Sequence, residues 1–365
     1  MTSGRCFATV ITRSYLADAR ALARSIRRFH ADPIYVLCID DPDGFVDPRG
    51  EPFTLLTLND VLPPEDRAQV FYYTAFELCN SCRAYLHRYL RDRTNHESWV
   101  YLDSDIFVTA PLDPLFAALT DAGTCGLFTA HCLDPAPIPL IEPVETSLQM
   151  YGVYNSGFLA LRRTGASGAF VDWFVSRLRV LCFFMERGVY VDQLWMNLLP
   201  ELFPDIRSWK HRGANVAYWN IHERVITADG DRVLANGEPL LFMHFSRWNI
   251  EHPEDWSFGR PVANGSDPAV VAALGRQYRD ALLECGYSEC RRWPYGFARF
   301  SNCRSITKAM RRAYYEDFIA GRAGADSPFE HPERFPIWKY PPDIWPALRR
   351  AAGPLRSLRR RLMRD

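Results

Sequence analysis

Residues 6–41, CFATVITRSYLADARALARSIRRFHADPIYVLCIDD, predict a β-α-β unit. Positions 7–11, apart from Thr9, and positions 34–39 are apolar, as expected of buried strands. Between them, apolar side chains recur at helical spacing from Leu16 to Phe29, and the second run stops at Asp40 and Asp41. Such a unit favours a parallel sheet whose strands end at a ligand crevice. The opening of the chain therefore predicts an α/β fold.

The rest of the chain extends this pattern and then changes texture. Further helices are expected at residues 75–89 and 192–199, and further strands at 99–102, 106–108, 126–129, 157–161 and 240–245. Beyond residue 255, helical stretches at 270–283 and 306–319 alternate with segments rich in proline and aromatic residues. We therefore expect an α/β catalytic domain at 1–255, a mainly helical C-terminal extension at 256–345 and a basic tail at 346–365.

The composition indicates a folded protein that is not built to bind nucleic acid. Apolar residues make up 48% and aromatic residues 14%, and the formal net charge is zero. No apolar run approaches the length of a membrane span, and the N-terminus enters a strand without a signal-peptide core. Ten cysteines show no framework pattern, and Cys79 and Cys82 lie inside a predicted helix, so we interpret them as thiols. A cytoplasmic location is expected.

The basic tail leaves two interpretations open. Residues 349–365 contain seven arginines and one acidic residue, but only three lysines occur in the whole chain, so the arginines partly reflect a compositional bias. From Pro354 onward, Leu355, Leu358 and Leu362 would share one helical face. Such a helix could bind an anionic membrane surface peripherally, or the segment could be a solvated basic end.

The central chemical signal is Tyr101-Leu-Asp-Ser-Asp-Ile-Phe107. In an extended strand, residues two apart point the same way, so Asp103 and Asp105 project together at the end of a buried strand. Two converging carboxylates are costly to bury unless a cation neutralises them, and Mg²⁺ or Mn²⁺ suits oxygen ligands. A lone Asp-x-Asp pair also occurs in solvated turns, and after the first strand of haloacid-dehalogenase phosphatases. Here two predicted strands precede it, and Phe107 stands where those phosphatases carry Thr or Val.

Further motifs make the chain resemble GT-A glycosyltransferases, and within them the glycogenin and lipopolysaccharide-galactosyltransferase group. After the Asp-x-Asp pair come Tyr154-Asn-Ser-Gly157, Asp192-Gln193 and Phe242-Met-His-Phe-Ser246, in the family's order. The resemblance implies a Rossmann-like GT-A fold, with a mixed, mostly parallel sheet flanked by helices. The segment Gly213-Ala-Asn-Val-Ala-Tyr-Trp-Asn220 has no close counterpart in that group, but looks like one found in uncharacterised bacterial transferases of this fold.

The resemblance also implies roles on the nucleotide side of the site. Residues Thr12 and Ser14, with the acids Asp40 and Asp41, would contact the nucleoside. Arg83, expected on an exposed turn of the helix before the metal motif, would contact the donor. Ser104, between the two metal carboxylates, would also belong to the donor site.

The resemblance assigns the remaining residues to the metal and the sugar. Asp103, Asp105 and His244 would hold the ion, and two carboxylates with one imidazole favour Mn²⁺ over Mg²⁺. Asn155 would touch the transferred sugar, with Asp192 and Gln193 beneath it; these are the expected catalytic residues.

Each of these residues also has an ordinary structural interpretation. His244 could be a satisfied core histidine, and Asn155 could be a turn residue in the left-handed region. Asp192 could be the N-cap of its helix, a role compatible with catalysis. His131 could face the sugar pocket or have no role, and Trp219 could stack on a sugar or lie in the core.

We expect transfer of a hexose-type sugar from a nucleotide diphosphate, UDP by resemblance, to a hydroxyl of a glycan or lipid-linked acceptor. Retention of anomeric configuration is favoured by the resemblance. An inverting enzyme would need a carboxylate base, for which Asp134, Glu142 and Glu145 are candidates. The alternatives are a metal-dependent phosphoesterase or nucleotidyltransferase, and a non-catalytic glycan-binding protein with this fold.

Overall fold

A computed structural model describes residues 4–324, 326–336 and 338–340. The expected β-α-β unit is confirmed: β1 (Arg5–Ile11) and β2 (Ile34–Cys38) pair in parallel, with α1 (Leu16–Arg27) between them in the chain. The apolar residues of α1 are buried, among them Leu16, Leu22 and Ile26, because they recur on the helix face that packs on the sheet. The basic tail at 346–365 lies outside the described residues.

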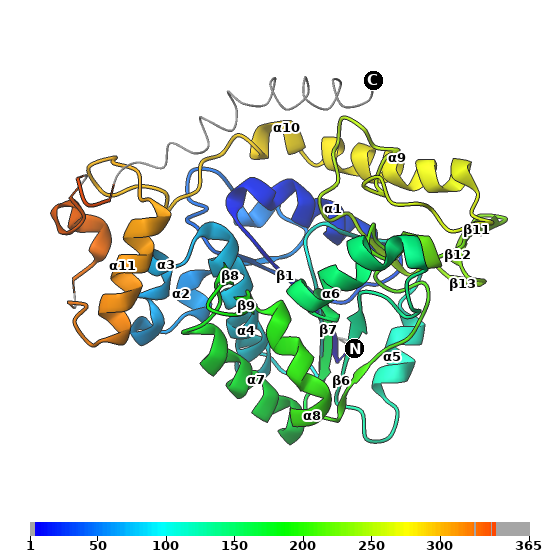
Figure 1. Cartoon of the computed structure of the whole chain (residues 1–365), viewed down its shortest axis with the longest axis horizontal. Coiled ribbons are helices and arrows are strands. Elements are labelled where there is room, and N and C mark those ends of the chain that lie inside the picture. The colour runs from blue at the N-terminus through cyan, green and yellow to red at the C-terminus, as the bar shows by residue number, and fades with distance from the viewer. Residues whose placement is uncertain (1–3, 325, 337, 341–365) are drawn as a thin grey trace. The chain divides into compact units, whose positions relative to one another are not determined.

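The main sheet has seven strands, in the order β10-β6-β7-β4-β1-β2-β3. All neighbouring strands pair in parallel except β7, which is antiparallel to both β4 and β6. The mixed, mostly parallel sheet expected from the sequence is therefore confirmed (Figure 1). Besides β1 and β2, the strands of this sheet are β3 (Thr54–Thr57), β4 (Ser98–Leu102), β6 (Gly126–Ala130), β7 (Tyr154–Arg162) and β10 (Ile206–Ser208).

Helices cover both faces of this sheet. Along β4, Val100 and Leu102 belong to the same buried cluster as α1, whereas Trp99 donates a 2.9 Å hydrogen bond to His87 of α4 (Ala75–Arg93). Alternate residues of the strand thus face α1 and α4, as the two-residue period of a strand requires. Helix α4 also packs against α7 (Gly165–Leu178) on its side of the sheet (Figure 1).

A second, two-stranded sheet brings a distant segment to the end of β4. Strand β5 (Ile106–Val108), directly after the Asp-x-Asp pair, is antiparallel to β14 (Phe242–His244). In this register His244 lies opposite Ile106. All six residues of the two strands are buried, so apolar packing holds the register.

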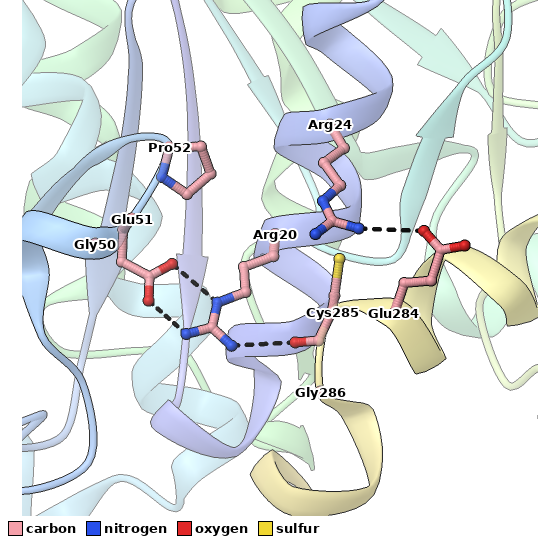
Figure 2. Close-up of a pocket in the computed structure, with 8 residues that line it drawn as sticks. All are labelled: Arg20, Arg24, Gly50, Glu51, Pro52, Glu284, Cys285 and Gly286. Carbon is pink, nitrogen blue, oxygen red and sulfur yellow. Dashed lines mark hydrogen bonds and ion pairs between the residues drawn. The ribbon is translucent and has the colours of Figure 1, made fainter.

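The first compact unit comprises residues up to 66 together with 75–295, and so continues past residue 255, where the sequence texture changes. Its last helices are α9 (Pro268–Glu284) and α10 (Tyr287–Cys290), and α9 packs on α1. Arg20 of α1 adds a polar link: it donates to both carboxylate oxygens of Glu51, at 2.9 and 2.5 Å, and to the carbonyl oxygen of Cys285 (Figure 2).

The second unit comprises residues 67–74 and the described residues from 296 onward. Its helices are α3 (Gln69–Tyr72) and α11 (Lys308–Ile319), the latter close to the helix expected at 306–319. Phe71 is fully buried there and meets the rings of Tyr314 and Phe329 at centroid distances of 4.9 and 5.1 Å.

The remaining elements are α2 (Leu58–Val61), α5 (Asp113–Leu119), α6 (Thr146–Tyr151), α8 (Leu199–Leu202), β8 (Phe184–Glu186), β9 (Val189–Tyr190), β11 (Ile226–Asp229), β12 (Arg232–Ala235) and β13 (Glu238–Pro239).

Candidate active site

Asp103 and Asp105 follow the carboxyl end of the interior strand β4. The amide of Asp103 donates to the carbonyl oxygen of Gly157 at 2.8 Å, and the carbonyl oxygen of Asp103 accepts from Ile106 at 3.0 Å. These backbone bonds hold the turn between β4 and β5 in place. The two carboxyl side chains are 19% and 30% exposed, whereas Ser104 between them is buried. The carboxylates are therefore accessible at one edge of an otherwise buried strand.

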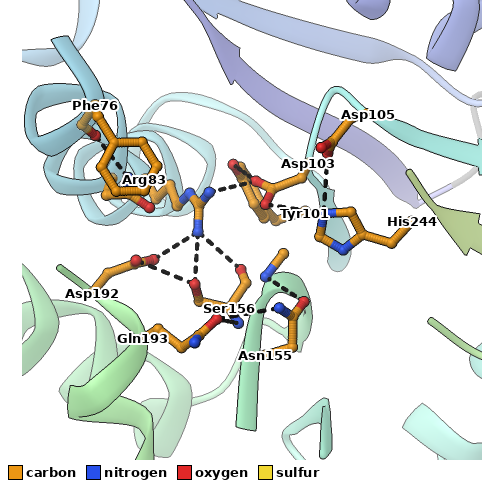
Figure 3. Close-up of polar contacts among 12 residues, drawn as sticks. Phe76, Arg83, Tyr101, Asp103, Asp105, Asn155, Ser156, Asp192, Gln193 and His244 are labelled. Atoms are coloured by element: carbon orange, nitrogen blue, oxygen red, sulfur yellow. Dashed lines mark hydrogen bonds and ion pairs between the residues drawn. The ribbon is translucent and has the colours of Figure 1, made fainter. Parts of the chain in front are cut away.

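His244 faces this carboxylate pair. Its Nε2 lies 3.0 Å from Asp105 Oδ1 and 3.8 Å from Asp103 Oδ2, and its ring is buried (Figure 3). Burial lowers the pKa of His244, but the Asp105 and Asp103 carboxylates together outweigh burial, and the net pKa is raised. Burial likewise raises the pKa of Asp105, but its attraction to His244 leaves the net pKa lowered. His244 is thus paired with the acids, rather than being an inert core residue.

The three side chains fit a divalent cation. One ligand atom from each of Asp103, Asp105 and His244 lies within 4.8 Å of the others. The absence of a side chain at Gly157 provides the space for these ligands. A Cβ at this position would lie 2.4 Å from His244 Cε1 and 2.8 Å from Asp103 Oδ2. Two carboxylates with one imidazole are a donor set that Mn²⁺ accepts readily, and Mg²⁺ less so.

Arg83 connects the metal carboxylates to Asp192. Its Nη2 donates to Asp103 Oδ1 at 2.6 Å, and its Nη1 donates to Asp192 Oδ2 at 2.9 Å (Figure 3). Tyr101 donates its hydroxyl to the same Asp103 oxygen at 2.7 Å. The expectation that Arg83 lies on an exposed turn is wrong, because its side chain contacts Tyr101 of β4 and Ser156 of β7 and is only 10% exposed.

Asp192 is fully buried beneath this arginine. Its Oδ1 accepts a 3.2 Å hydrogen bond from the Ser156 hydroxyl, and its side chain makes no capping bond to the following helix. The N-cap explanation is therefore wrong for this side chain, which points to Arg83 instead. Burial raises the pKa of Asp192 to about 6, although Arg83 acts in the opposite direction.

Asn155 and Gln193 form the adjoining amide network. Asn155 Nδ2 donates to Gln193 Oε1 at 3.2 Å, and Gln193 Nε2 donates to the carbonyl oxygen of Tyr151 at 2.8 Å. Asn155 belongs to strand β7 and is absent from the residues with positive φ, so its interpretation as a left-handed turn residue is wrong. The register of β6 with β7 shifts beside it, between Phe128 and Thr129, as at a β-bulge.

Two asparagines of the segment 213–220, which carried no expected role, complete this network. Asn215 donates to Asn155 Oδ1 at 3.0 Å and accepts from His244 Nδ1 at 3.1 Å. Asn220 donates to the carbonyl oxygens of His131 and Asn215. Both asparagines are fully buried. The unusual sequence of the segment was the one signal that could have indicated them.

His131 and Trp219 flank the same region. The Trp219 ring meets the His244 ring edge-on at 5.0 Å and the His131 ring at 5.3 Å, and its Nε1 is buried with no hydrogen-bond partner among the described residues. Burial lowers the pKa of His131 to about 4, with its hydrogen bond to the Val153 carbonyl acting in the opposite direction. His131 is consequently neutral at physiological pH.

The expected nucleoside residues gather around Arg13, where β1 and β2 end. Asp40 Oδ1 accepts from the Arg13 amide at 2.7 Å, and Arg13 Nη1 donates to the Asp41 carbonyl oxygen at 2.9 Å. The hydroxyls of Thr12 and Ser14 lie 2.9 Å apart. These contacts hold the loop after β1 against the loop after β2. The two loops are neighbours because β1 and β2 are parallel and end at the same edge of the sheet.

No protein-family model matches the chain. Two curated proteins of Bacillus subtilis are similar to it: the uncharacterized protein YfnF is 27% identical over 68% of this chain and 83% of its own length. The uncharacterized protein YfnD is 26% identical over 67% of this chain and 78% of its own length.

Several solved glycosyltransferases are also similar in structure. The galactosyltransferase LgtC, in complex with donor and acceptor sugar analogs, is 16% identical and covers 77% of this chain and 95% of that chain, with a TM-score of 0.45. The glycosyltransferase GlyE of Streptococcus pneumoniae is 15% identical over 82% of this chain and 67% of that chain, with a TM-score of 0.44. Among the described residues, no helix combines the length and apolar character needed to cross a membrane.

Proposed function

We propose that this chain is a metal-dependent glycosyltransferase that moves a sugar from a nucleotide diphosphate donor to a hydroxyl of a glycan or lipid-linked acceptor. The observation that carries the proposal is the convergence of Asp103, Asp105 and His244 beside the buried Arg83–Asp192 pair. A cation site next to a fixed arginine suits a pyrophosphate, and the adjoining amides suit sugar hydroxyls.

Asp103, Asp105 and His244 would hold Mn²⁺ or Mg²⁺. When bound, such an ion neutralises the charge that develops on a departing nucleotide diphosphate. Arg83 holds Asp103 through a single oxygen, so that Asp103 Oδ2 stays directed at His244. Arg83 also adds a fixed positive charge at the same place.

The sugar pocket would be built from Asn155, Asp192 and Gln193. The carboxylate of Asp192 is held by Arg83 and Ser156, so its position is fixed before any substrate binds. Asn155 and Gln193 orient each other's amides. Prepositioned polar groups of this kind align a sugar ring without reorganising during reaction.

For the nucleoside we propose Thr12, Ser14, Asp40 and Asp41, with UDP as the nucleotide and a hexose as the sugar. The group around Arg13 offers hydroxyls and carboxylates, which can bind ribose and base donors. GDP is the alternative nucleotide, and a panel of donors separates the two.

Retention of configuration is proposed because two of the three candidate bases of an inverting mechanism are engaged elsewhere. Asp134 is bound by both terminal nitrogens of Arg212, at 2.5 and 2.9 Å. Glu145 accepts from the Ala136 amide at 2.9 Å. Product stereochemistry, determined by NMR on the first turnover, tests this part of the proposal.

The deciding experiment is calorimetry with nucleotide sugars, with and without Mn²⁺, on the wild type and Asp105→Ala. We expect Mn²⁺-dependent donor binding that Asp105→Ala weakens at least about a hundredfold. Exposed Asp121, changed to Ala, is the matched control and should bind as the wild type. Donor binding that Asp105→Ala leaves unchanged, or no binding of any nucleotide sugar, contradicts the proposal.

The two rival functions predict different results in this experiment and in an assay of phosphate release. A phosphoesterase or nucleotidyltransferase releases phosphate or pyrophosphate without an acceptor, and gives no use to the amides of Asn155 and Gln193. A non-catalytic glycan-binding protein shows no metal-dependent nucleotide binding.

We further propose that the tail at 346–365 binds anionic membranes; equal liposome binding by a chain cut before Pro354 would contradict this.

A further inference from the structure

Asn215 occupies an unusual backbone position beside the candidate metal site. Its φ is +54°, in the left-handed region that asparagine tolerates better than most residues, and it is fully buried. The next residue, Val216, accepts a 2.9 Å hydrogen bond from the His244 amide and donates a 3.2 Å bond to the Phe242 carbonyl. The backbone of Asn215 is therefore tied to β14, the strand that carries His244.

The side chain of Asn215 joins three neighbours. Its Nδ2 lies 2.8 Å from Thr129 Oγ1 and 3.0 Å from Asn155 Oδ1, and its Oδ1 lies 3.1 Å from His244 Nδ1. A threonine hydroxyl can donate or accept, so Thr129 does not decide which way the amide points. The orientation has to come from Asn155.

Backbone groups fix the orientation of the Asn155 amide. The Gly157 amide donates to one side-chain position of Asn155 at 3.1 Å, which must therefore be its oxygen. On the other side, Gln193 accepts from the Ser156 amide at 3.3 Å through the same oxygen that faces Asn155. Two backbone N–H groups thus require Asn155 to present its oxygen to Asn215 and its nitrogen to Gln193.

The consequence reaches His244. Because Asn155 presents an oxygen, Asn215 must present its nitrogen there and turn its own oxygen towards His244 Nδ1. That oxygen can only accept, so Nδ1 of His244 carries the hydrogen and donates it. In the neutral ring that a metal ion requires, the lone pair is then on Nε2, which faces the space between Asp103 and Asp105.

We infer that Asn215 is the positioning residue that fixes the ring orientation and tautomer of His244 for a divalent cation, and that it couples this ligand to the sugar-facing amide of Asn155. The inference rests on the metal site of the proposed function. A hydrogen-bond acceptor behind a ligating imidazole raises the basicity of the ligand and holds its ring in place.

The test is Mn²⁺ binding, measured with MnCl₂ alone from the electron paramagnetic resonance signal of free Mn²⁺. The principal variant is Asn215→Gly, which removes the amide but keeps the left-handed backbone accessible. Asn236→Gly is the matched control, because Asn236 has the same φ of +54° and also joins two backbone groups, Val225 N–H and the Glu223 carbonyl, outside the site. Asn215→Asp retains an acceptor for His244 but cannot donate to Asn155 or Thr129.

We expect Asn215→Gly to weaken Mn²⁺ binding by about 10- to 100-fold, with Asn236→Gly unchanged and Asn215→Asp within about threefold of the wild type. Affinity close to that of the wild type in Asn215→Asp would show that the hydrogen-bond acceptor is what matters. A residue needed only for packing would lose affinity in both variants. If Asn215→Gly does not fold, a weakening of Mn²⁺ binding by about tenfold or more in Asn215→Asp overturns the inference. Unchanged binding in Asn215→Gly also overturns it and leaves the metal site standing, whereas a wild type that binds no Mn²⁺ overturns both.

Discussion

Arg83 Nη2 lies 2.6 Å from Asp103 Oδ1, so the acid that begins the metal motif is held by a buried guanidinium. The other terminal nitrogen of that guanidinium is 2.9 Å from Asp192. The Arg83 guanidinium therefore lies between two carboxylates that would otherwise repel each other in a buried setting. The proposed cation site and Asp192, which we propose lies beneath the sugar, share this arginine, so a change to Arg83 should affect both.

Replacing Arg83 with Ala should reduce both stability and donor binding. The change leaves Asp192 buried without its cation, and breaking a buried ion pair costs about 3–5 kcal/mol of unfolding free energy. Arg83→Lys keeps the charge but not the planar fork, so it should fall between Ala and the wild type. Urea denaturation and calorimetry with a nucleotide sugar measure the two effects. Arg88→Ala, on the same helix, should cost less than about 1 kcal/mol; equal losses at both positions would contradict the prediction.

Asp192→Asn should separate stability from activity. The amide can still accept from Arg83 and donate to Ser156, and it removes a charge whose burial is unfavourable, as the pKa raised to about 6 indicates. The unfolding free energy should therefore change by less than about 1 kcal/mol. The kcat/KM for sugar transfer should fall at least about a hundredfold if the carboxylate lies beneath the reacting sugar. A variant that keeps full activity would show that this charge has no catalytic role.

Gly157→Ala should impair cation binding, because no space exists for a methyl group. Its Cβ would lie 2.4 Å from His244 Cε1 and 2.9 Å from Asn155 Oδ1, and both side chains would have to move. We expect Mn²⁺ affinity to fall at least about tenfold, since ligand displacement weakens a metal site. Gly165→Ala is the control: a Cβ there meets nothing within 4 Å, so affinity should stay the same. Similar Mn²⁺ affinities for the two variants would count against the site geometry.

The buried His131 should make the fold sensitive to mild acid. Burial lowers its pKa to about 4, whereas the unfolded chain binds a proton near pH 6.5. Between these values the unfolded state holds the extra proton, so stability falls as pH falls, by about 1.4 kcal/mol per pH unit. The raised pKa values of Asp18 and Asp192 act in the opposite direction, so the wild type must be compared with His131→Gln. The difference in unfolding free energy between the two proteins should shift by about 2 kcal/mol from pH 6.5 to 5, against the wild type. A difference that does not vary with pH would contradict this.

Local pattern was sufficient for the first strands, the helix between them and the carboxylate pair. The apolar run of β4, which is buried throughout, and the position of Asp103 and Asp105 directly after it can be read from one short segment. The pair nevertheless lies in the turn between β4 and β5, and the expectation of an extended strand at these residues was wrong. The helices α9 and α11 were likewise visible as periodic stretches. These features depend only on neighbours in the chain, and so can be predicted from it.

The burial of Arg83, the ion pair of Asp192 and the place of Asn155 in a strand were not visible in this way. An arginine on a helix is normally solvated, and an aspartate before a short helix normally caps it. Here each side chain has a partner on another element, so its role depends on how α4, β4 and β7 pack. Local preference gave way to tertiary pairing at these positions, all of them in the candidate site.

The sequence by itself determined that two carboxylates, Asp103 and Asp105, follow directly on a buried strand, because the apolar run stops at this pair. The strand geometry expected for the pair was wrong, since residues 103–105 form the turn between β4 and β5. Only the tertiary structure decided what completes the site. The pairing of β14 with β5 brings His244 to the two acids, and the left-handed Asn215 orients its ring. Backbone pairing between distant segments follows from the packing of the whole core, so the chemistry begun by two neighbouring residues is finished by the fold.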